Sequence, residues 1–165
     1  SIRRQRQMCI RDRSYVARLH ELGYELPSVA QPLASYVPAL RVGDQVWTSG
    51  QLPLVDGALP ATGKVGAEVS VEQATELART AILNALAAVD AAVGLDNVSR
   101  VLKVVGFVAS DPAFGEQPAV INGASDFLGE VFGEAGAHAR SAVGVAVLPK
   151  NSPVEIELIV EIKSV

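Results

Sequence analysis

The residues best suited to chemistry lie in the last quarter of the chain, residues 137–162, where Arg140 stands among small and apolar residues. Two carboxylates, Glu155 and Glu157, follow at a spacing of two. A guanidinium that is buried without a partner is strongly destabilising. Arg140 must therefore reach solvent, pair with a carboxylate of the chain, or hold an anionic ligand, and the last alternative would be a functional site.

The same segment is predicted to form a β-hairpin that turns at residues 149–153. Side chains alternate between the two faces of a strand, so Arg140 shares its face with very small residues. These are Ala142, Gly144 and Ala146. In this register Arg140 lies opposite Glu161, whereas Glu155 lies roughly 20 Å away and is not expected to touch it within one chain. The pattern alone favours an Arg140–Glu161 salt bridge over a ligand site.

Other catalytic or metal-binding clusters are not indicated. The two histidines and the single cysteine, Cys9, are far apart in the sequence, so no zinc site is predicted. One cysteine cannot form an intramolecular disulfide, which favours a reducing, cytoplasmic location. Ser49 has no histidine or aspartate at a suggestive spacing, and His138, near the start of the Arg140 strand, is interpreted as incidental.

Length and charge restrict the class of protein. The 165 residues suit one domain. No apolar run approaches the roughly 18 residues of a membrane span, so no membrane partner is expected.

Residues 1–13 hold five arginines and one aspartate, a net charge of +4, and are predicted to be a basic tail that is disordered or non-native. Residues 14–165, the expected domain, carry nine basic and 17 acidic side chains, a net charge of −8. Such a domain is a poor binder of nucleic acid.

The first part of the domain predicts a short helix, two strands and a long loop. The helix is expected over residues 14–22, with Ser14 as its N-cap. Residues 34–53 predict two strands around a turn at Gly43 and Asp44. Residues 55–68 are rich in glycine and proline, and the sequence leaves open whether this loop covers a cleft.

The rest of the domain predicts two longer helices and three strands. A capping box at residues 70–73 begins a helix whose apolar residues recur every three or four positions as far as Gly94. The β-branched run at 98–110 predicts a buried strand. The second helix is expected to begin near Gln117, with Pro118 in its first turn.

The element order β-β-α-β-α-β-β predicts an α+β domain, a mainly antiparallel sheet with two helices on one face. The other face of this sheet poses a problem. Strands at 100–110 and 139–148 contain too much valine, alanine and glycine to lie against water. An apolar face that the helices cannot cover indicates an oligomer.

Four segments together resemble the Rid family, the YjgF-like reactive-intermediate deaminases that are also labelled L-PSP endoribonucleases. The most specific is ARSAVGVAVLPKNSPVEIE at residues 139–157. The others are SYVPAL at 35–40, TSGQLP at 48–53, and Asn122 after Val120 and Ile121. The resemblance spans about residues 33–162, and the longer loop and the first helix indicate a longer, divergent subgroup.

The resemblance implies a chorismate-mutase-like fold, a homotrimer, and pockets in the clefts between subunits. Arg140 of one subunit and Glu155 of its neighbour would then line one cleft, and this favours the ligand site at Arg140 over the salt bridge. The implied activity is the hydrolysis of enamines and imines such as 2-aminoacrylate to a 2-keto acid and ammonia. No metal and no organic cofactor are implied.

Roles for individual residues also follow from the resemblance. Arg140 would hold the substrate carboxylate, because a planar guanidinium binds a carboxylate through two hydrogen bonds. Glu155 would orient or activate the attacking water. The remaining substrate contacts would come from Tyr36, Ser49, Gly50, Asn122 and the residue at Ala142.

Two residues depart from the pattern of the family. Many members have a cysteine where this chain has Ala142, and a carboxylate is common where it has Gly144. Both changes are expected to enlarge the pocket, and attack by water does not require the cysteine. Two alternatives stay open, a non-catalytic trimer that binds small carboxylates and, against the charge of the domain, an endoribonuclease.

Overall fold

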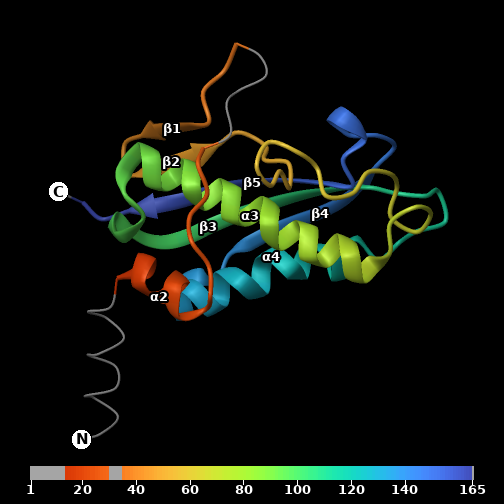
Figure 1. The fold of residues 1–165 in the computed structure, drawn as a ribbon. Helices are drawn as coiled ribbons and strands as arrows, with labels where there is room; N and C mark the ends of the chain where they lie inside the picture. Colours follow the sequence, from red (N-terminus) through yellow and green to blue (C-terminus); the bar gives the residue numbers. More distant parts are fainter. Residues whose placement is uncertain (1–13, 30–34, 165) are drawn as a thin grey trace, which may run out of the picture.

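The computed structural model describes residues 14–29 and 35–164, so the predicted tail at 1–13 lies outside the described residues. Helices cover one face of a five-stranded sheet (Figure 1). The helices are α2 (Tyr15–Glu21), α3 (Val71–Val93) and α4 (Gln117–Phe132), and the strands are β1 (Ala39–Val42), β2 (Gln45–Thr48), β3 (Val98–Ala109), β4 (Ala139–Val145) and β5 (Val154–Ile162). The predicted α+β class is confirmed.

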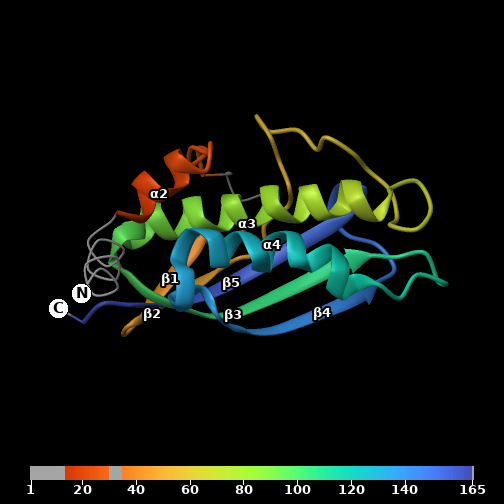
Figure 2. The ribbon, with the colours of Figure 1, turned by 90° about the horizontal axis from the view of Figure 1, so that it is seen from below.

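The strands lie in the order β1-β2-β5-β3-β4. Three of the four neighbouring pairs are antiparallel, and only β3 and β4 run parallel. The prediction of a mainly antiparallel sheet is therefore confirmed. In the view of Figure 2, α3 and α4 lie along one side of the sheet, as the element order indicated.

The predicted hairpin between the last two strands is wrong. β4 pairs with β3, and β5 is inserted between β2 and β3. A short 3₁₀ turn (Pro149–Asn151), in which Lys150 and Asn151 have φ angles of 58° and 59°, redirects the chain toward the centre of the sheet. Alternating apolar residues identify a strand and its buried face, but they do not identify its neighbours.

The prediction of a salt bridge between Arg140 and Glu161 is also wrong, because β4 does not pair with β5. Glu161 lies opposite Gln45 on one side and Arg100 on the other, and its carboxylate accepts a hydrogen bond of 3.0 Å from the hydroxyl of Ser99. Arg140 lies on β4, the edge strand beyond β3.

The helix boundaries follow the local signals in the sequence. The hydroxyl of Ser70 accepts a hydrogen bond of 3.1 Å from the backbone N–H of Gln73, so this residue caps α3 as predicted. Gly94 ends α3 with a φ of 83°, a conformation that glycine adopts without strain. Ser14 caps α2, and α4 begins at Gln117 with proline in its first turn, both as predicted.

Two glycines allow α4 to lie close to its neighbours. A Cβ atom on Gly123 would clash with the backbone carbonyl of Thr75 in α3, and one on Gly106 of β3 would clash with the side chain of Ile121. The core then fills with apolar residues of both helices and of the inner sheet face, such as Phe127. This close packing holds α4 directly above the β3–β4 edge.

The face of the sheet that points away from the helices carries exposed apolar side chains. Trp47 is 50% exposed and Val143 43% exposed. Leu40 and Val42 on β1 are more than half exposed. We call these four residues the open apolar face. Within the described part of the chain, no helix has the length and apolar character needed to cross a membrane.

Candidate functional site

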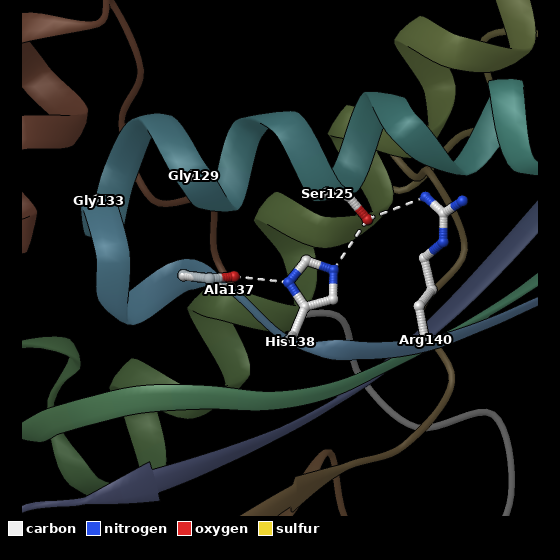
Figure 3. A pocket seen from close by; sticks show the side chains of 7 residues that line it. Ser125, Gly129, Gly133, Ala137, His138 and Arg140 are labelled. Atoms are coloured by element: carbon white, nitrogen blue, oxygen red, sulfur yellow. Dashed lines mark hydrogen bonds between the residues drawn. The ribbon is translucent and has the colours of Figure 1, made fainter.

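Arg140 points from the edge strand β4 toward α4, where polar side chains receive its guanidinium (Figure 3). Its Nη1 donates to Oδ1 of Asn122 at 2.7 Å and to Oγ of Ser125 at 3.2 Å. Its Nη2 lies 3.5 Å from the carbonyl of Pro118. The structure therefore brings the predicted residues Arg140 and Asn122 together.

Sequence reasoning missed Ser125. It lies three residues after Asn122, which places both side chains on the same side of a helix. That spacing was the available signal. It became informative only once β4, and not another strand, was known to lie beneath α4.

His138 makes two hydrogen bonds near the arginine. Its Nε2 is 2.9 Å from the hydroxyl of Ser125, and its Nδ1 is 2.6 Å from the carbonyl of Gly136. A surface depression opens here between the end of α4 and the start of β4 (Figure 3). Its lining residues are Ser125, Gly129, Gly133, Gly136, Ala137, His138 and Arg140.

The two departures from the family pattern lie on the same strand as Arg140. Ala142 packs against the core next to α4. A Cβ atom on Gly144 would lie only 2.7 Å from Nε2 of Gln117 and 3.1 Å from the hydroxyl of Ser110. The end of the Gln117 side chain therefore fills part of the space beside Gly144, and the expectation that the two changes enlarge the pocket stays a prediction.

A second group of predicted residues surrounds Glu155 on β5. The backbone of Gln51 exchanges two hydrogen bonds with that of Ile156, at 2.7 and 3.0 Å. This pairing holds Gly50 close to the Glu155 carboxyl. A Cβ atom on Gly50 would lie only 2.9 Å from Cδ of Glu155. Glycine leaves the room that this approach requires.

Ser49 joins the Tyr36 segment to this second group. Its hydroxyl donates to the carbonyl of Val37, and its backbone N–H donates to the carbonyl of Pro38 at 2.8 Å. Tyr36, which is 48% exposed, directly precedes the two residues whose carbonyls bind Ser49. The structure thus brings Gly50 and Glu155 together and ties the backbone after Tyr36 to Ser49.

Asn84 anchors the loop that follows Gly50. This buried residue of α3 donates from Nδ2 to the carbonyls of Leu52 and Leu54, both at 3.0 Å. Its signal in the sequence was a polar residue within a long alanine-rich apolar stripe. Such a residue is usually satisfied by hydrogen bonds inside the protein.

The electrostatic surroundings of Glu155 change its acidity. Partial burial raises the pKa of the Glu155 carboxyl above its ordinary value of 4.5, and repulsion from the carboxylate of Glu157 raises it further. A carboxylate with a raised pKa is a stronger proton acceptor once it is ionised.

The two groups do not meet within one chain. Arg140 pairs with Val104 in the sheet, and Val104 is fully buried beneath the helices. Glu155 pairs with Phe107, three residues further along β3 and therefore on the opposite face. The expectation that Arg140 and Glu155 do not touch within a chain agrees with this arrangement, although the separation arises from the two faces of the sheet and not from a hairpin register.

Comparison with known proteins identifies the family. Residues 16–162 match the model of a family that is described as YjgF/chorismate mutase-like and as endoribonucleases. The chain belongs to the YjgF family. The resemblance to Rid proteins that the sequence indicated is thereby confirmed.

Relatives of this YjgF-family chain span most of its length. Protein TCP17 of Trypanosoma cruzi is 45% identical over 150 residues, which cover 90% of the chain and 94% of that protein. A 2-iminobutanoate/2-iminopropanoate deaminase of Dermatophagoides farinae is 36% identical over 138 residues, covering 83% and 93%. The crystal structure of the protein Atu1372 from Agrobacterium tumefaciens, of unknown function, is 46% identical with a TM-score of 0.85, covering 94% and 96%.

Proposed function

We propose that this YjgF-family protein is a hydrolytic deaminase of enamines and imines derived from amino acids, such as 2-aminoacrylate. The observation that carries the proposal is the division of the candidate residues into two prearranged groups, one around Arg140 and one around Glu155. One group suits a carboxylate and the other suits a water molecule. The relative from Dermatophagoides farinae, named as an imine deaminase, supports this reaction class.

The proposal includes a homotrimer with three clefts between subunits. Arg140 of one subunit and Glu155 of the next line each cleft, since the two residues lie on opposite faces of the sheet within a chain. The neighbouring subunits cover the open apolar face. Removing its tryptophan, valines and leucine from water provides the driving force for association.

The guanidinium of Arg140 receives the substrate carboxylate. Its Nη1 is occupied by Asn122 and Ser125, and Nη2 uses one of its two hydrogens toward the Pro118 carbonyl at 3.5 Å. The edge formed by Nε and the second hydrogen of Nη2 is the one left to face a ligand. Two parallel N–H groups along that edge match the two oxygens of a carboxylate. The substrate is thereby held with its reacting carbon at a defined distance from the opposite wall of the cleft.

Glu155 activates the attacking water. Its carboxylate accepts a proton from the water as the oxygen adds to the carbon of the C=N bond, and the imine nitrogen takes up a proton from solvent. Glu155 then returns its proton to the nitrogen of the resulting carbinolamine. As the C–N bond breaks, the hydroxyl group loses its proton to solvent, which releases ammonia and leaves the 2-keto acid. An enamine such as 2-aminoacrylate first takes a proton on carbon to give the imine. Gly50 contributes backbone polar groups beside the carboxylate.

The proposal is tested by the release of 2-keto acid from imines that an amino-acid oxidase generates in situ. Wild-type protein is expected to accelerate this release above the spontaneous rate, and Arg140→Ala is expected to abolish the acceleration. Arg41→Ala serves as the matched control, because Arg41 is an exposed arginine on β1. An Arg140→Ala protein that retains the wild-type rate would contradict the assignment.

The same experiment separates the alternatives. A trimer that only binds carboxylates is protected by pyruvate against thermal unfolding but shows no turnover. An endoribonuclease cleaves RNA, and such cleavage must disappear in an Arg140→Ala, Glu155→Ala double variant if it belongs to this site.

A further inference from the structure

A chain of hydrogen bonds connects Arg140 to the backbone at the end of α4. Nη1 of Arg140 donates to Oγ of Ser125 at 3.2 Å. The same Oγ lies 2.9 Å from Nε2 of His138, and Nδ1 of that histidine lies 2.6 Å from the carbonyl of Gly136. Figure 3 shows Ser125 between the imidazole and the guanidinium.

The direction of each bond follows from the chemistry of the groups. A carbonyl only accepts hydrogen bonds, so Nδ1 of His138 must carry the hydrogen that reaches Gly136. In a neutral imidazole Nε2 is then an acceptor, and the Ser125 hydroxyl donates to it. The oxygen of Ser125 is left to accept from Arg140. The three bonds therefore all run from the guanidinium toward the Gly136 carbonyl.

This chain holds the guanidinium from one side. Nη1 has two hydrogens, and Asn122 and Ser125 each accept one of them. Both acceptors belong to α4, so they fix the plane of the guanidinium relative to that helix. A bidentate carboxylate contact requires this plane to be set before the ligand arrives.

We propose that Ser125 and His138 are positioning residues that hold the guanidinium of Arg140 in the orientation in which it binds a carboxylate. The Ser125 hydroxyl donates to Nε2 of His138, so its oxygen faces Nη1 of Arg140. The edge formed by Nε and Nη2 is thereby left facing the ligand. The inference rests on the proposed function, since it concerns the same arginine.

No carboxylate among the residues that line the depression competes with Ser125 for the guanidinium of Arg140. Of these lining residues, only His138 and Arg140 can carry a charge. Lys103 lies opposite Ala139 and therefore on the other face of the sheet. The acidic residues nearest in sequence, on α4 and in the 3₁₀ turn after it, are exposed and outside the lining, namely Asp126, Glu130 and Glu134.

The tautomer can be read directly by NMR of the imidazole nitrogens. The chain has two histidines, His20 and His138, so a His20→Gln variant leaves a single imidazole to observe. The neutral form of His138 is expected to carry its hydrogen on Nδ1. A hydrogen on Nε2 would overturn the proposed direction of the chain.

Binding of pyruvate, measured by calorimetry, tests the positioning role. Ser125→Ala and His138→Leu are expected to weaken binding roughly tenfold and to raise KM with a much smaller change in kcat. His138→Gln keeps both a donor and an acceptor in its side-chain amide, and it is expected to restore most of the affinity that His138→Leu loses. Ser125→Ala and His138→Leu proteins that bind pyruvate with wild-type affinity and wild-type KM would overturn the proposal.

The outcomes separate this inference from the deaminase assignment. Pyruvate binding that Ser125→Ala weakens, in a protein without turnover, contradicts the deaminase and supports the positioning role. Wild-type turnover with a Ser125→Ala variant of unchanged KM and unchanged pyruvate affinity contradicts only the positioning role. Pyruvate binding that Arg140→Ala leaves unchanged contradicts both.

Discussion

The proposed chemistry of Glu155 depends on two features of its surroundings. The carboxyl is partly buried, with Gly50 close beside it, and Glu157 lies on the same face two residues further along β5. Both effects favour the protonated carboxyl and raise its pKa. Glu155 therefore has to lose a proton at a higher pH than an ordinary glutamate before it can accept one from water.

The pH dependence of kcat follows from this shift. Because the ionised form of Glu155 is the active one, kcat is expected to rise with pH along a limb that lies above the ordinary glutamate value of 4.5. Glu157→Gln removes the repulsion and is expected to move the limb to lower pH, whereas Glu161→Gln, further along the same strand, serves as the control and should leave the limb in place. Steady-state rates across pH, at saturating substrate, measure this, and coincident limbs for Glu157→Gln and wild type would contradict it.

Removing the carboxylate itself is expected to have a larger effect. Glu155→Gln has nearly the same shape but cannot accept a proton, so kcat should fall by roughly 10²- to 10⁴-fold at every pH. Thermal unfolding serves as the control that the variant is folded. A Glu155→Gln protein with near wild-type kcat would exclude Glu155 as the base.

At the scale of elements, the position of α4 decides where Arg140 finds its partners. Gly123 lies between Asn122 and Ser125, the two acceptors of the guanidinium, and it permits the close contact with the backbone of α3. The same residue therefore links the packing of the helical layer to the geometry of the site.

Gly123→Ala tests this link. The added methyl group meets the carbonyl of Thr75, a backbone atom that moves only with its helix, so the free energy of unfolding is expected to fall by about 1–3 kcal/mol. Gly129→Ala is the matched control on the same helix. Its Cβ would meet no atom within 4 Å, and the better helix propensity of alanine should raise stability by about 0.5–1 kcal/mol. Denaturant unfolding measures both, and equal effects of the two changes would contradict the packing argument.

At the scale of the whole molecule, the open apolar face and the divided site both support the proposed trimer. Half-exposed Trp47 and Val143 lie on the face that also bears Glu155. A neighbour that covers this face is in a position to bring its own Arg140 to the carboxylate. Trp47→Lys places a charge in the proposed interface and is expected to dissociate the proposed trimer and abolish turnover together, as light scattering and rate measurements would show.

Mixing two inactive variants tests whether the cleft is shared. Arg140→Ala and Glu155→Gln proteins, unfolded together in equal amounts and refolded, should regain roughly a quarter of the wild-type activity. The reason is that roughly three-quarters of random trimers are mixed, and one cleft in three of those pairs an intact arginine with an intact glutamate. Absence of any recovery from folded mixed trimers would place the site within one chain.

Local patterns in the sequence were sufficient for the elements and for one face of the sheet. The Ser70 cap, the Gly94 stop and the start of α4 at Gln117 depend on neighbouring residues only, and all three are confirmed. The alternation from Val154 to Ile162 identified the buried side of β5, and with it the outward direction of Glu155. The resemblance of four short segments was sufficient for the family, as the match over residues 16–162 confirms.

Strand order and the partners of Arg140 were decided by the tertiary structure. The alternation that marks β4 and β5 is the same whether the two strands pair with each other or lie on either side of β3, so the sequence alone favoured the wrong neighbours. Which strand lies beneath α4 depends on the packing of the whole sheet. That packing brought Asn122, Ser125 and His138 to Arg140 and placed Glu155 on the opposite face, because contacts between residues far apart in the chain are not written in any local pattern.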